Sequence, residues 1–325
     1  MFSISTPGIL IVHIRSLTIA LTCLIGVASA AKAADPVKVR TILSHACTEA
    51  KELVPDIFGF SSGSDVGAVG SWAGAIEYGG AFGTRMGSFA NHSLKFQVAT
   101  SPMPCLEIGP SIIMGFDRRT SSPALTRDSA RQAGVAVEVK YKVLSRSIHG
   151  IGLTIVAEPS ILAGSSNSAD FLTPMFTRGS GAFVANTTKF LFDAELVPDT
   201  IYAALNLEHT AQWTSQGLAG CATGGGFCRA SALTVRAAIS TQVMKDLFFG
   251  LETAYARAHD GIALNRSVGS AWFVGPNMFW QINEKVSLQA AYSIQVSGNA
   301  RGLAGNLNLR DFSRSVAKLK LGFSF

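Results

Sequence analysis

The chain lacks long apolar runs: outside its first 33 residues, no uninterrupted apolar stretch approaches the length that crosses a bilayer. A transmembrane helix needs about 20 consecutive apolar residues, and even the run from Leu17 to Ala28 is shorter. Arg15 precedes this run, and small residues that suit a signal peptidase follow it up to Ala33. Residues 1–33 are therefore interpreted as a signal peptide, so the exported chain is expected to have no membrane-spanning helix.

Clustered charge and the common ligand-binding motifs are also absent from the sequence. The net charge of +6 is spread along the chain, so the sequence gives no support for nucleic-acid binding. The histidines are scattered, without the spacing of a metal site. The glycine run Gly224–Gly226 lies between two cysteines rather than between a strand and a helix, so it does not suit phosphate binding. We expect no cofactor and no metal.

Proline and cysteine are both scarce. The chain has 11 prolines against 32 glycines, a balance that suits a protein of many hairpins. Four cysteines remain beyond residue 33, and an even number in an exported protein favours disulfides. Cys221 and Cys228 bracket a glycine-rich tip and are expected to pair, which leaves Cys47 and Cys105 for a second bridge.

Many stretches of the chain alternate between apolar and polar residues, the pattern of strands with one face of each kind. The clearest are Val286–Val296, Val135–Val143 and Arg229–Met244. Nine further stretches are roughly 71–83, 93–101, 105–118, 151–162, 188–197, 201–213, 247–259, 270–282 and 314–325. The sequence thus predicts about twelve strands. Counts of ten to fourteen stay open, because Pro110, Pro159 and Pro276 fall inside strands, where each is expected to mark a bulge or an early end.

The final stretch is the most telling one. Leu319, Leu321 and Phe323 alternate with Lys318 and Lys320, and the sequence ends on Phe325. Tight turns at 145–150, 197–200, 244–246 and 284–285 alternate with longer links along the chain, as in membrane barrels with short inner turns and longer outer loops. The final stretch resembles the C-terminal β-signal of Gram-negative outer-membrane proteins.

The whole pattern resembles the porin-like outer-membrane β-barrels of Gram-negative bacteria over residues 70–325. The resemblance implies an all-β fold, a transmembrane antiparallel up-and-down barrel in the bacterial outer membrane. Residues 34–69 are expected to form a periplasmic N-terminal segment, in which 59–70 is interpreted as a flexible linker. The implied partners are outer-membrane lipid and lipopolysaccharide, the barrel-assembly machinery and small solutes. Association into a homo-oligomer is left open.

Charged residues on the polar faces of the expected strands are predicted to line the pore. They carry both signs, so two interpretations stay open: opposed acidic and basic rows across an aqueous pore, or pairs that fill a narrow lumen. A barrel near twelve strands lies between filled eight-stranded and open sixteen-stranded cases, and we favour a narrow pore. The predicted residues are Glu77, Lys95, Glu107, Glu138, Lys140, Lys142, Glu158, Asp193, Glu195, Glu208, Arg236, Glu252, Arg314, Lys318 and Lys320.

The longest expected outer loop, 163–187, is rich in apolar residues such as Phe171 and Phe176. Because exposed apolar groups must be buried somewhere, we expect this loop to fold into the lumen as a constriction, with Asp170 and Arg178 at its narrowest part. Packing against neighbouring loops, or a further hairpin, is the alternative.

The predicted function is passive diffusion of small hydrophilic solutes through a narrow charged lumen. The first alternative is a structural barrel with a closed lumen, and the second is a channel for hydrophobic compounds, which the inward charges disfavour. No enzyme is expected. Outer-membrane phospholipases use a His-x-Ser-Asn-Gly motif, whereas His92 and Ser93 are adjacent and so point to opposite faces of a strand. Omptin-type proteases need paired acids on their outer loops, and His259 and Asp260 have no such pair beside them.

Overall fold

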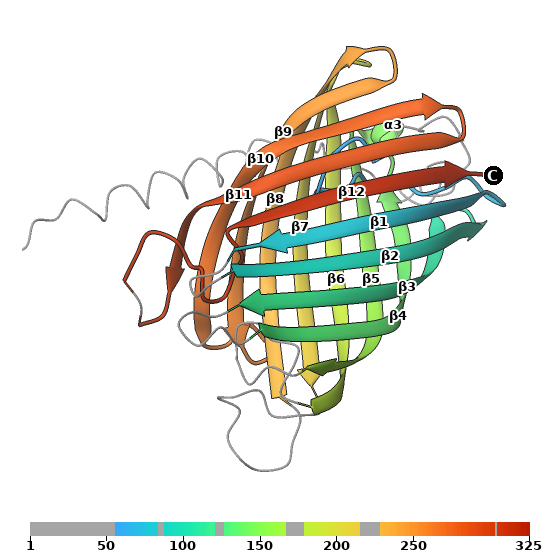
Figure 1. Cartoon of the computed structure of the whole chain (residues 1–325). Helices are drawn as coiled ribbons and strands as arrows, with labels where there is room; N and C mark the ends of the chain where they lie inside the picture. Colours follow the sequence, from blue (N-terminus) through green and yellow to red (C-terminus); the bar gives the residue numbers. More distant parts are fainter. Residues whose placement is uncertain (1–55, 84–87, 121–126, 167–178, 215–227, 303) are drawn as a thin grey trace, which may run out of the picture. The chain divides into compact units, whose positions relative to one another are not determined.

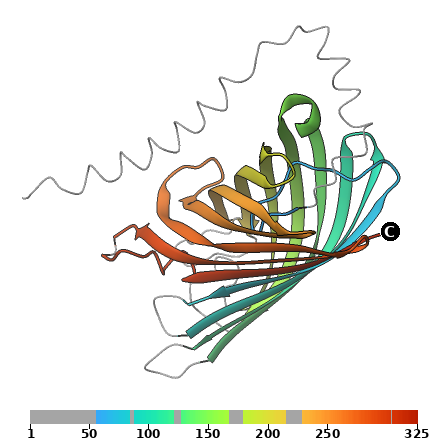
Figure 2. The same cartoon turned by 90° about the horizontal axis from the view of Figure 1, so that it is seen from above.

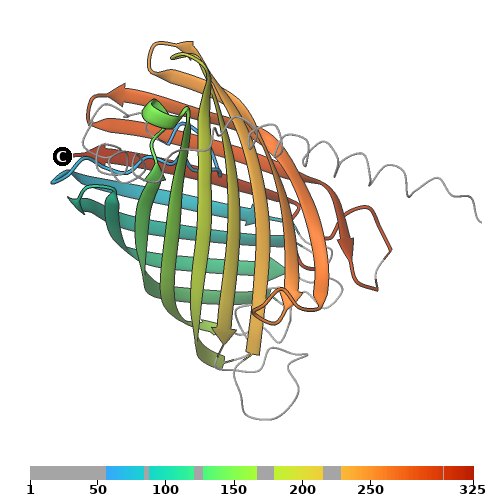
Figure 3. The ribbon, with the colours of Figure 1, turned by 180° about the vertical axis from the view of Figure 1, so that it is seen from behind.

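The structure is a computed structural model that describes residues 56–83, 88–120, 127–166, 179–214, 228–302 and 304–325. All of them belong to one compact unit, Ala46–Phe325. Twelve antiparallel strands form a closed barrel in which each strand pairs with its neighbours in the sequence and β1 pairs with β12. Figures 1 and 3 show the barrel from its two sides. The strands are β1 (Trp72–Phe82), β2 (Ser88–Met103), β3 (Leu106–Thr120), β4 (Arg127–Leu144), β5 (Ile151–Ser166), β6 (Gly179–Val197), β7 (Ile201–Thr214), β8 (Cys228–Met244), β9 (Leu247–Asp260), β10 (Ser267–Asn283), β11 (Val286–Ala300) and β12 (Ser315–Ser324).

The alternation of the sequence gives the barrel an apolar outer surface. Because successive side chains of a strand point to opposite faces, the apolar positions of each strand share one face. Every strand exposes at least one large apolar side chain there, among them Ile76, Phe96, Ile112, Val135, Ile161, Val184, Leu207, Ile239, Leu251, Val274, Tyr292 and Leu319. A soluble barrel would bury such groups, so the surface is that of a barrel that crosses a membrane.

Short turns join the strands at one end of the barrel, which we call the turn end. They lie at 104–105, 145–150, 198–200, 245–246 and 284–285. Cys105, Asp199 and Asp246 have positive φ there, the conformation that closes a tight hairpin. The only helix among the described residues, α3 (Arg146–His149), forms one of these turns and ends at Gly150, with φ of 75°. No helix in the described part of the chain is long and apolar enough to span a bilayer.

The three prolines inside strands do not mark bulges or strand ends, so that expectation was wrong. Pro110 pairs with Val137 in register, and Pro276 pairs with Leu251 in the same way. Each proline instead leaves a two-residue gap in the pairing with its other neighbouring strand, and the register resumes unchanged beyond the gap. The N–H of a strand residue bonds to only one of its two neighbouring strands. Each proline therefore loses a hydrogen bond to that strand, and its pairing with the other strand stays complete.

The strands are longer than the alternation predicted, mainly at the other end of the barrel, which we call the loop end. β4 begins at Arg127 rather than Val135, and β6 begins at Gly179 rather than near 188. The backbone ladder continues there although the apolar face stops, as expected for strands that extend beyond the lipid. The described parts of the expected outer loop 163–187, residues 163–166 and 179–187, are therefore strand. Asp170 and Arg178 lie outside the described residues, and the constriction they were expected to form stays a prediction.

A stretch of chain before β1 lies within the barrel. We call Asp56–Gly67 the interior segment; it is the blue coil inside the ring of strands in Figure 2. Side chains of nine strands, β3 to β9, β11 and β12, hydrogen-bond or ion-pair with it. Contacts with strands on all sides can be made only across the barrel interior. The interpretation of residues 59–70 as a flexible linker was wrong for this part.

Candidate functional site

The barrel interior is the candidate site, and Glu252 of β9 fixes the interior segment at its centre. Its carboxylate accepts hydrogen bonds from three consecutive backbone N–H groups: Gly59 N at 2.8 Å, Phe60 N at 2.6 Å and Ser61 N at 3.1 Å. Three N–H groups that converge on one anion form a backbone anion site, and bonds to a charged group are stronger than neutral ones. Glu252 is buried, so its charge is neutralised mainly by these peptide dipoles.

Polar side chains of other strands bind the rest of the segment in the same manner. Asn206 of β7 accepts from Ser62 N at 2.6 Å and donates to Ser62 O at 2.8 Å. Asp193 of β6 accepts from Ser64 N at 2.7 Å and Ser64 Oγ at 2.9 Å. Glu107 of β3 accepts from Gly67 N at 2.8 Å. The backbone groups that an irregular segment would leave unsatisfied are thus paired with the wall.

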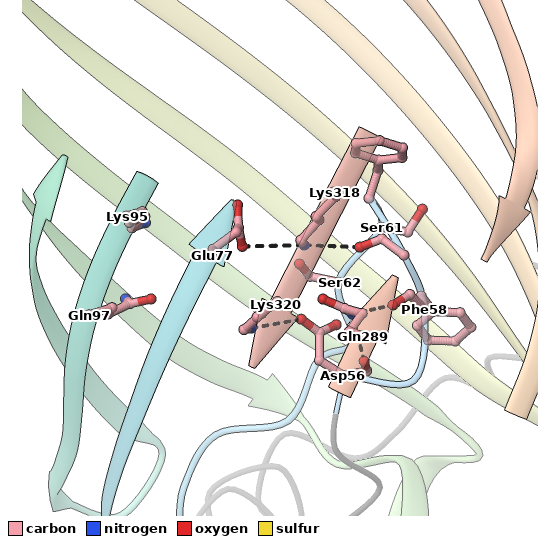
Figure 4. Close-up of polar contacts among 12 residues, drawn as sticks. Asp56, Phe58, Ser61, Ser62, Glu77, Lys95, Gln97, Gln289, Lys318 and Lys320 are labelled. Atoms are coloured by element: carbon pink, nitrogen blue, oxygen red, sulfur yellow. Dashed lines mark hydrogen bonds and ion pairs between the residues drawn. The ribbon is translucent and has the colours of Figure 1, made fainter. Parts of the chain in front are cut away.

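The start of the segment is held by β11 and β12. Gln289 donates to the backbone oxygens of Asp56 and Phe58, and Lys318 donates to Gly59 O at 2.9 Å. The carboxylate of Asp56 lies 3.4 Å from Lys320 Nζ, and a dashed line marks this ion pair in Figure 4. Burial acts to raise the pKa of Asp56, but Lys320 and Lys318 outweigh it and hold that pKa below its ordinary value.

Two apolar side chains add to this anchorage. Ile57 and Phe58 are 1% and 2% exposed, and they pack in a cluster with Tyr202, Phe248 and Phe279 on the inner face of the wall. Burial of a large apolar side chain contributes roughly 1.5–3 kcal/mol. The segment is therefore held by an apolar anchor at its start and by polar contacts along the rest of its length.

Glycines allow the segment to approach the wall closely. A Cβ at Gly59 would lie 2.5 Å from Ala291 Cβ and 2.8 Å from Asn277 Cβ. On the wall itself, a Cβ at Gly152 of β5 would collide with Ser64 and Asp193. The close contact therefore needs glycine at two places, at Gly59 on the segment and at Gly152 on the wall.

Beside the segment, charged residues of both signs form one alternating chain on the inner face of β2 to β6. Glu158 binds Lys95 and Lys189, with 3.1 Å to Lys189. Glu138 joins Lys189 at 3.7 Å to Lys140 at 3.5 Å, and Lys140 reaches Glu107 at 3.0 Å. Lys95 and Glu158 lie on strands that are not neighbours, so their contact crosses the interior. Acids and bases are paired here, rather than separated into opposed rows.

A second ionic cluster connects the segment to the turn that holds α3. Arg146 binds Asp65 at 2.9 Å and Asp193 at 2.8 Å, and Lys142 binds Asp65 at 3.1 Å. The cluster holds two acids and two bases. Burial acts to lower the pKa of Arg146, but the carboxylates of Asp65 and Asp193 raise it above its ordinary value, so the guanidinium stays charged.

Most of the residues predicted to line the lumen meet in these groups, and three do not: Arg236, which lies over the ring of Phe60, and Glu195 and Arg314. Lys318 lies 3.5 Å from Glu77, and Glu208 pairs in register with Lys189. Glu195 is exposed beside the turn at 198–200, and Arg314 is exposed just before β12 begins. Whether the interior residues line an open path stays a prediction.

Sequence reasoning missed the uncharged and segment residues of the site. It selected charged residues on alternating strands, so it passed over Asn206 and Gln289, which alternation also places on the inner face. It missed Asp56 and Asp65 because the segment has no strand or helix pattern. The apolar pair Ile57–Phe58, followed by glycine and serine, was the available signal of an anchored rather than a free segment.

The predicted disulfides are tested only in part. Cys105 is buried at the turn between β2 and β3 and is disulfide-bonded. Its predicted partner, Cys47, lies outside the described residues, so that pairing stays a prediction. The Cys221–Cys228 bridge also stays a prediction, because the link that contains Cys221 is outside the described part. Among the described residues, no group of histidine, cysteine and acidic side chains is placed to hold a metal.

A cavity of about 340 Å³ lies between the interior segment and the connection from β11 to β12. Phe60 and Ser61 line it from the segment, and Asp311, Phe312 and Ser313 line it from the connection. The connection turns inward because Asn308, fully buried, donates to Asn299 O and Asp311 at 2.9 Å each. The described interior is thus filled from both ends by the chain itself, with this space between.

The closed twelve-stranded wall, its apolar outer surface and its polar interior define a porin-like outer-membrane β-barrel. The chain belongs to the family of unknown function DUF6662, whose model matches residues 50–325. Comparison with curated protein sequences gave no match.

Solved structures that share the fold include two with the following similarity. An outer membrane channel from Pseudomonas putida F1 has a TM-score of 0.52 at 11% identity, with 81% of this chain and 98% of that chain covered. The beta domain of the Bordetella autotransporter BrkA has a TM-score of 0.54 at 12% identity, with 83% of this chain and 100% of that chain covered. At these identities the likeness shows the fold and nothing finer.

Proposed function

We propose that the protein is an outer-membrane channel for passive diffusion of small solutes, with the interior segment restricting its lumen. The observation that carries the proposal is the content of the barrel. Eight-stranded barrels are filled by their own side chains. This wider barrel is instead occupied by a separate stretch of chain, held largely by polar contacts, with a cavity beside it. A hydrogen bond between the segment and the wall can be exchanged for hydrogen bonds to water at a small net cost in free energy.

The outer surface supports the location. A band of large apolar side chains on all twelve strands suits contact with acyl chains. The likeness of the barrel to an outer membrane channel is consistent with a channel role, although it concerns the fold alone. The paired charges favour a narrow path over a wide water-filled pore. A wide pore with a strong transverse field would need acidic and basic residues in opposed rows, whereas the acids and bases described here are paired.

A structural barrel with a closed lumen is the second candidate. The apolar anchor Ile57–Phe58 and the paired ionic clusters favour it, since both resist movement of the segment. The two candidates differ in one measurable property, the passage of ions.

The test is the conductance of the refolded protein in a planar bilayer, for the wild type and for Glu252→Gln. The amide of glutamine presents its own N–H groups to a site built from three N–H donors, so the segment is expected to loosen. We expect a small conductance in the wild type and a several-fold larger or more frequent open state in the variant. Glu284→Gln, in an exposed turn, removes the same charge without touching the segment and should match the wild type. Absence of any conductance in all three proteins would establish the closed barrel instead.

A further inference from the structure

The cavity beside the interior segment has the size and the polarity of a ligand site. Its volume of about 340 Å³ is at the lower end of the range for small-molecule pockets. Six of its 14 lining residues are apolar: Phe60, Phe273 and Phe312 are the large groups, and Ala254, Ala256 and Val316 are the smaller ones. A ligand there would bury an apolar body of a few carbon atoms against aromatic rings.

One cation of the cavity has no anionic partner. The guanidinium of Arg236, on β8, lies over the ring of Phe60 with 5.9 Å to its centroid. Within the described ranges, no hydrogen bond or ion pair of Arg236 is present in the structure. An arginine offers five donors in a planar fork that matches a carboxylate. A guanidinium held against an aromatic ring in a partly apolar cavity is therefore ready to bind an anion.

The two acids that line the cavity already have hydrogen-bond partners. Glu252 accepts three backbone N–H groups of the interior segment. Asp311 accepts from Arg310 Nε at 2.9 Å and from Asn308 at 2.9 Å. Both carboxylates thus already have N–H donors as partners, whereas the guanidinium of Arg236 has, in the described part of the chain, only the ring of Phe60 beside it, so Arg236 is the charged group of the lining that still lacks a polar partner there.

A second polar group of the lining is also unsatisfied. The hydroxyl of Ser61 is fully buried, and it has no hydrogen-bond partner in the structure. A buried hydroxyl without a partner carries a desolvation cost, which a ligand oxygen would relieve. Ser61 and Arg236 both line the same cavity, so one ligand can satisfy both.

We propose that this cavity binds a small organic anion with an apolar body, such as an aromatic carboxylate. Arg236 takes the carboxylate, Ser61 donates to one of its oxygens, and the three phenylalanines enclose the ring. This proposal rests on the proposed channel function, since it names the class of solute that the channel admits.

The test is equilibrium binding measured by calorimetry on the folded full barrel in detergent, with benzoate as the probe. Benzylamine and benzyl alcohol carry the same ring with a positive charge and with none. We expect saturable binding of benzoate, and much weaker binding of the other two. Arg236→Gln should weaken benzoate binding at least about tenfold, because a charge-assisted pair is lost. Ser61→Ala should weaken it by a smaller factor.

Matched variants keep the result free of folding artefacts. Arg257→Gln, on neighbouring β9, removes an exposed arginine that does not line the cavity and should bind benzoate as the wild type does. Ala254→Phe fills the cavity and should abolish binding. Retained heat-modifiable migration on gels would show that each variant is folded. Equal binding of benzoate and benzylamine, no saturable benzoate binding by the wild type, or unchanged binding by Arg236→Gln would overturn the proposal.

A swelling assay with liposomes in benzoate separates this proposal from the channel function. Saturable binding without passage would keep the site and remove the channel. Passage without saturable binding would keep the channel and remove the site.

Discussion

At the scale of single residues, the interior is built from groups that need partners and from glycines that leave room for them. Glu252 holds three peptide N–H groups, and the absence of a side chain at Gly59 lets the backbone reach it. The two features depend on each other. Backbone N–H groups can stabilise the charge of a carboxylate on a strand only if that backbone lies against the wall.

Gly59→Val is therefore expected to displace the interior segment. The new Cβ would lie 2.5 Å from Ala291 Cβ, a contact that only a shift of the segment can relieve. We expect a several-fold rise in conductance and faster proteolysis of the segment in the folded barrel. Val69→Phe adds bulk at an exposed position just after the interior segment and should leave the conductance and the proteolysis unchanged. Equal behaviour of the two variants would contradict the packing described for Gly59.

A second prediction at this scale concerns the ionic chain. Lys189→Met removes the cation between Glu158 and Glu138 and leaves each of these partly buried acids with one cation, Lys95 for Glu158 and Lys140 for Glu138. We expect a loss of about 1–2 kcal/mol in the free energy of unfolding, less than for a fully buried pair. Arg266→Gln breaks the exposed pair with Asp260 and should cost no more than about 0.5 kcal/mol. Urea unfolding in detergent measures both, and equal effects would mean that the interior pairs contribute no more than surface ones.

At the scale of elements, the strands and the interior segment differ in how far the sequence predicts them. Strand alternation follows from two environments, lipid outside and polar groups inside, and all twelve strands are visible in it. Alternation fails beyond the lipid, so the loop-end extension of β4 could not be predicted. The segment has no period at all. Its position comes from contacts with wall residues 40 to 264 positions away, which no local pattern encodes.

One part of the response of the segment to acid follows from Asp56. Since Lys320 and Lys318 hold its pKa below the ordinary value of 3.8, the charged form is the one that the docked segment favours. The stabilisation is fully present above pH 3.8 and is lost as the pH falls through the lower, docked value. We expect the part of the segment's proteolytic protection that depends on Asp56 to stay constant from neutral pH down to about 4 and to fall only below that.

Asp56→Asn isolates this contribution. It should lower the protection at neutral pH and flatten that part of the acid response, while Asp199→Asn, in an exposed turn, should leave the profile unchanged. Loss of protection well above pH 4 in the wild type would show that another group controls the docking.

At the scale of the whole molecule, the wall and its contents are separate structures. The barrel closes through backbone ladders between successive strands and between β1 and β12, and no strand pairs with the interior segment. The lipid-facing side chains point away from it. Closure of the sheet therefore does not depend on the segment, whereas the state of the interior does.

A chain without residues 56–67 should consequently still fold as a barrel. We expect heat-modifiable migration and a β-type circular dichroism spectrum like those of the wild type, with a lower unfolding midpoint. The midpoint falls because Glu252, Asp193 and Asn206 lose their backbone partners, but water entering the emptied interior can solvate all three. Its conductance should exceed that of every point variant, since the whole obstruction is removed. If the shortened chain does not form a barrel, the segment acts as a folding template rather than as the content of a finished wall.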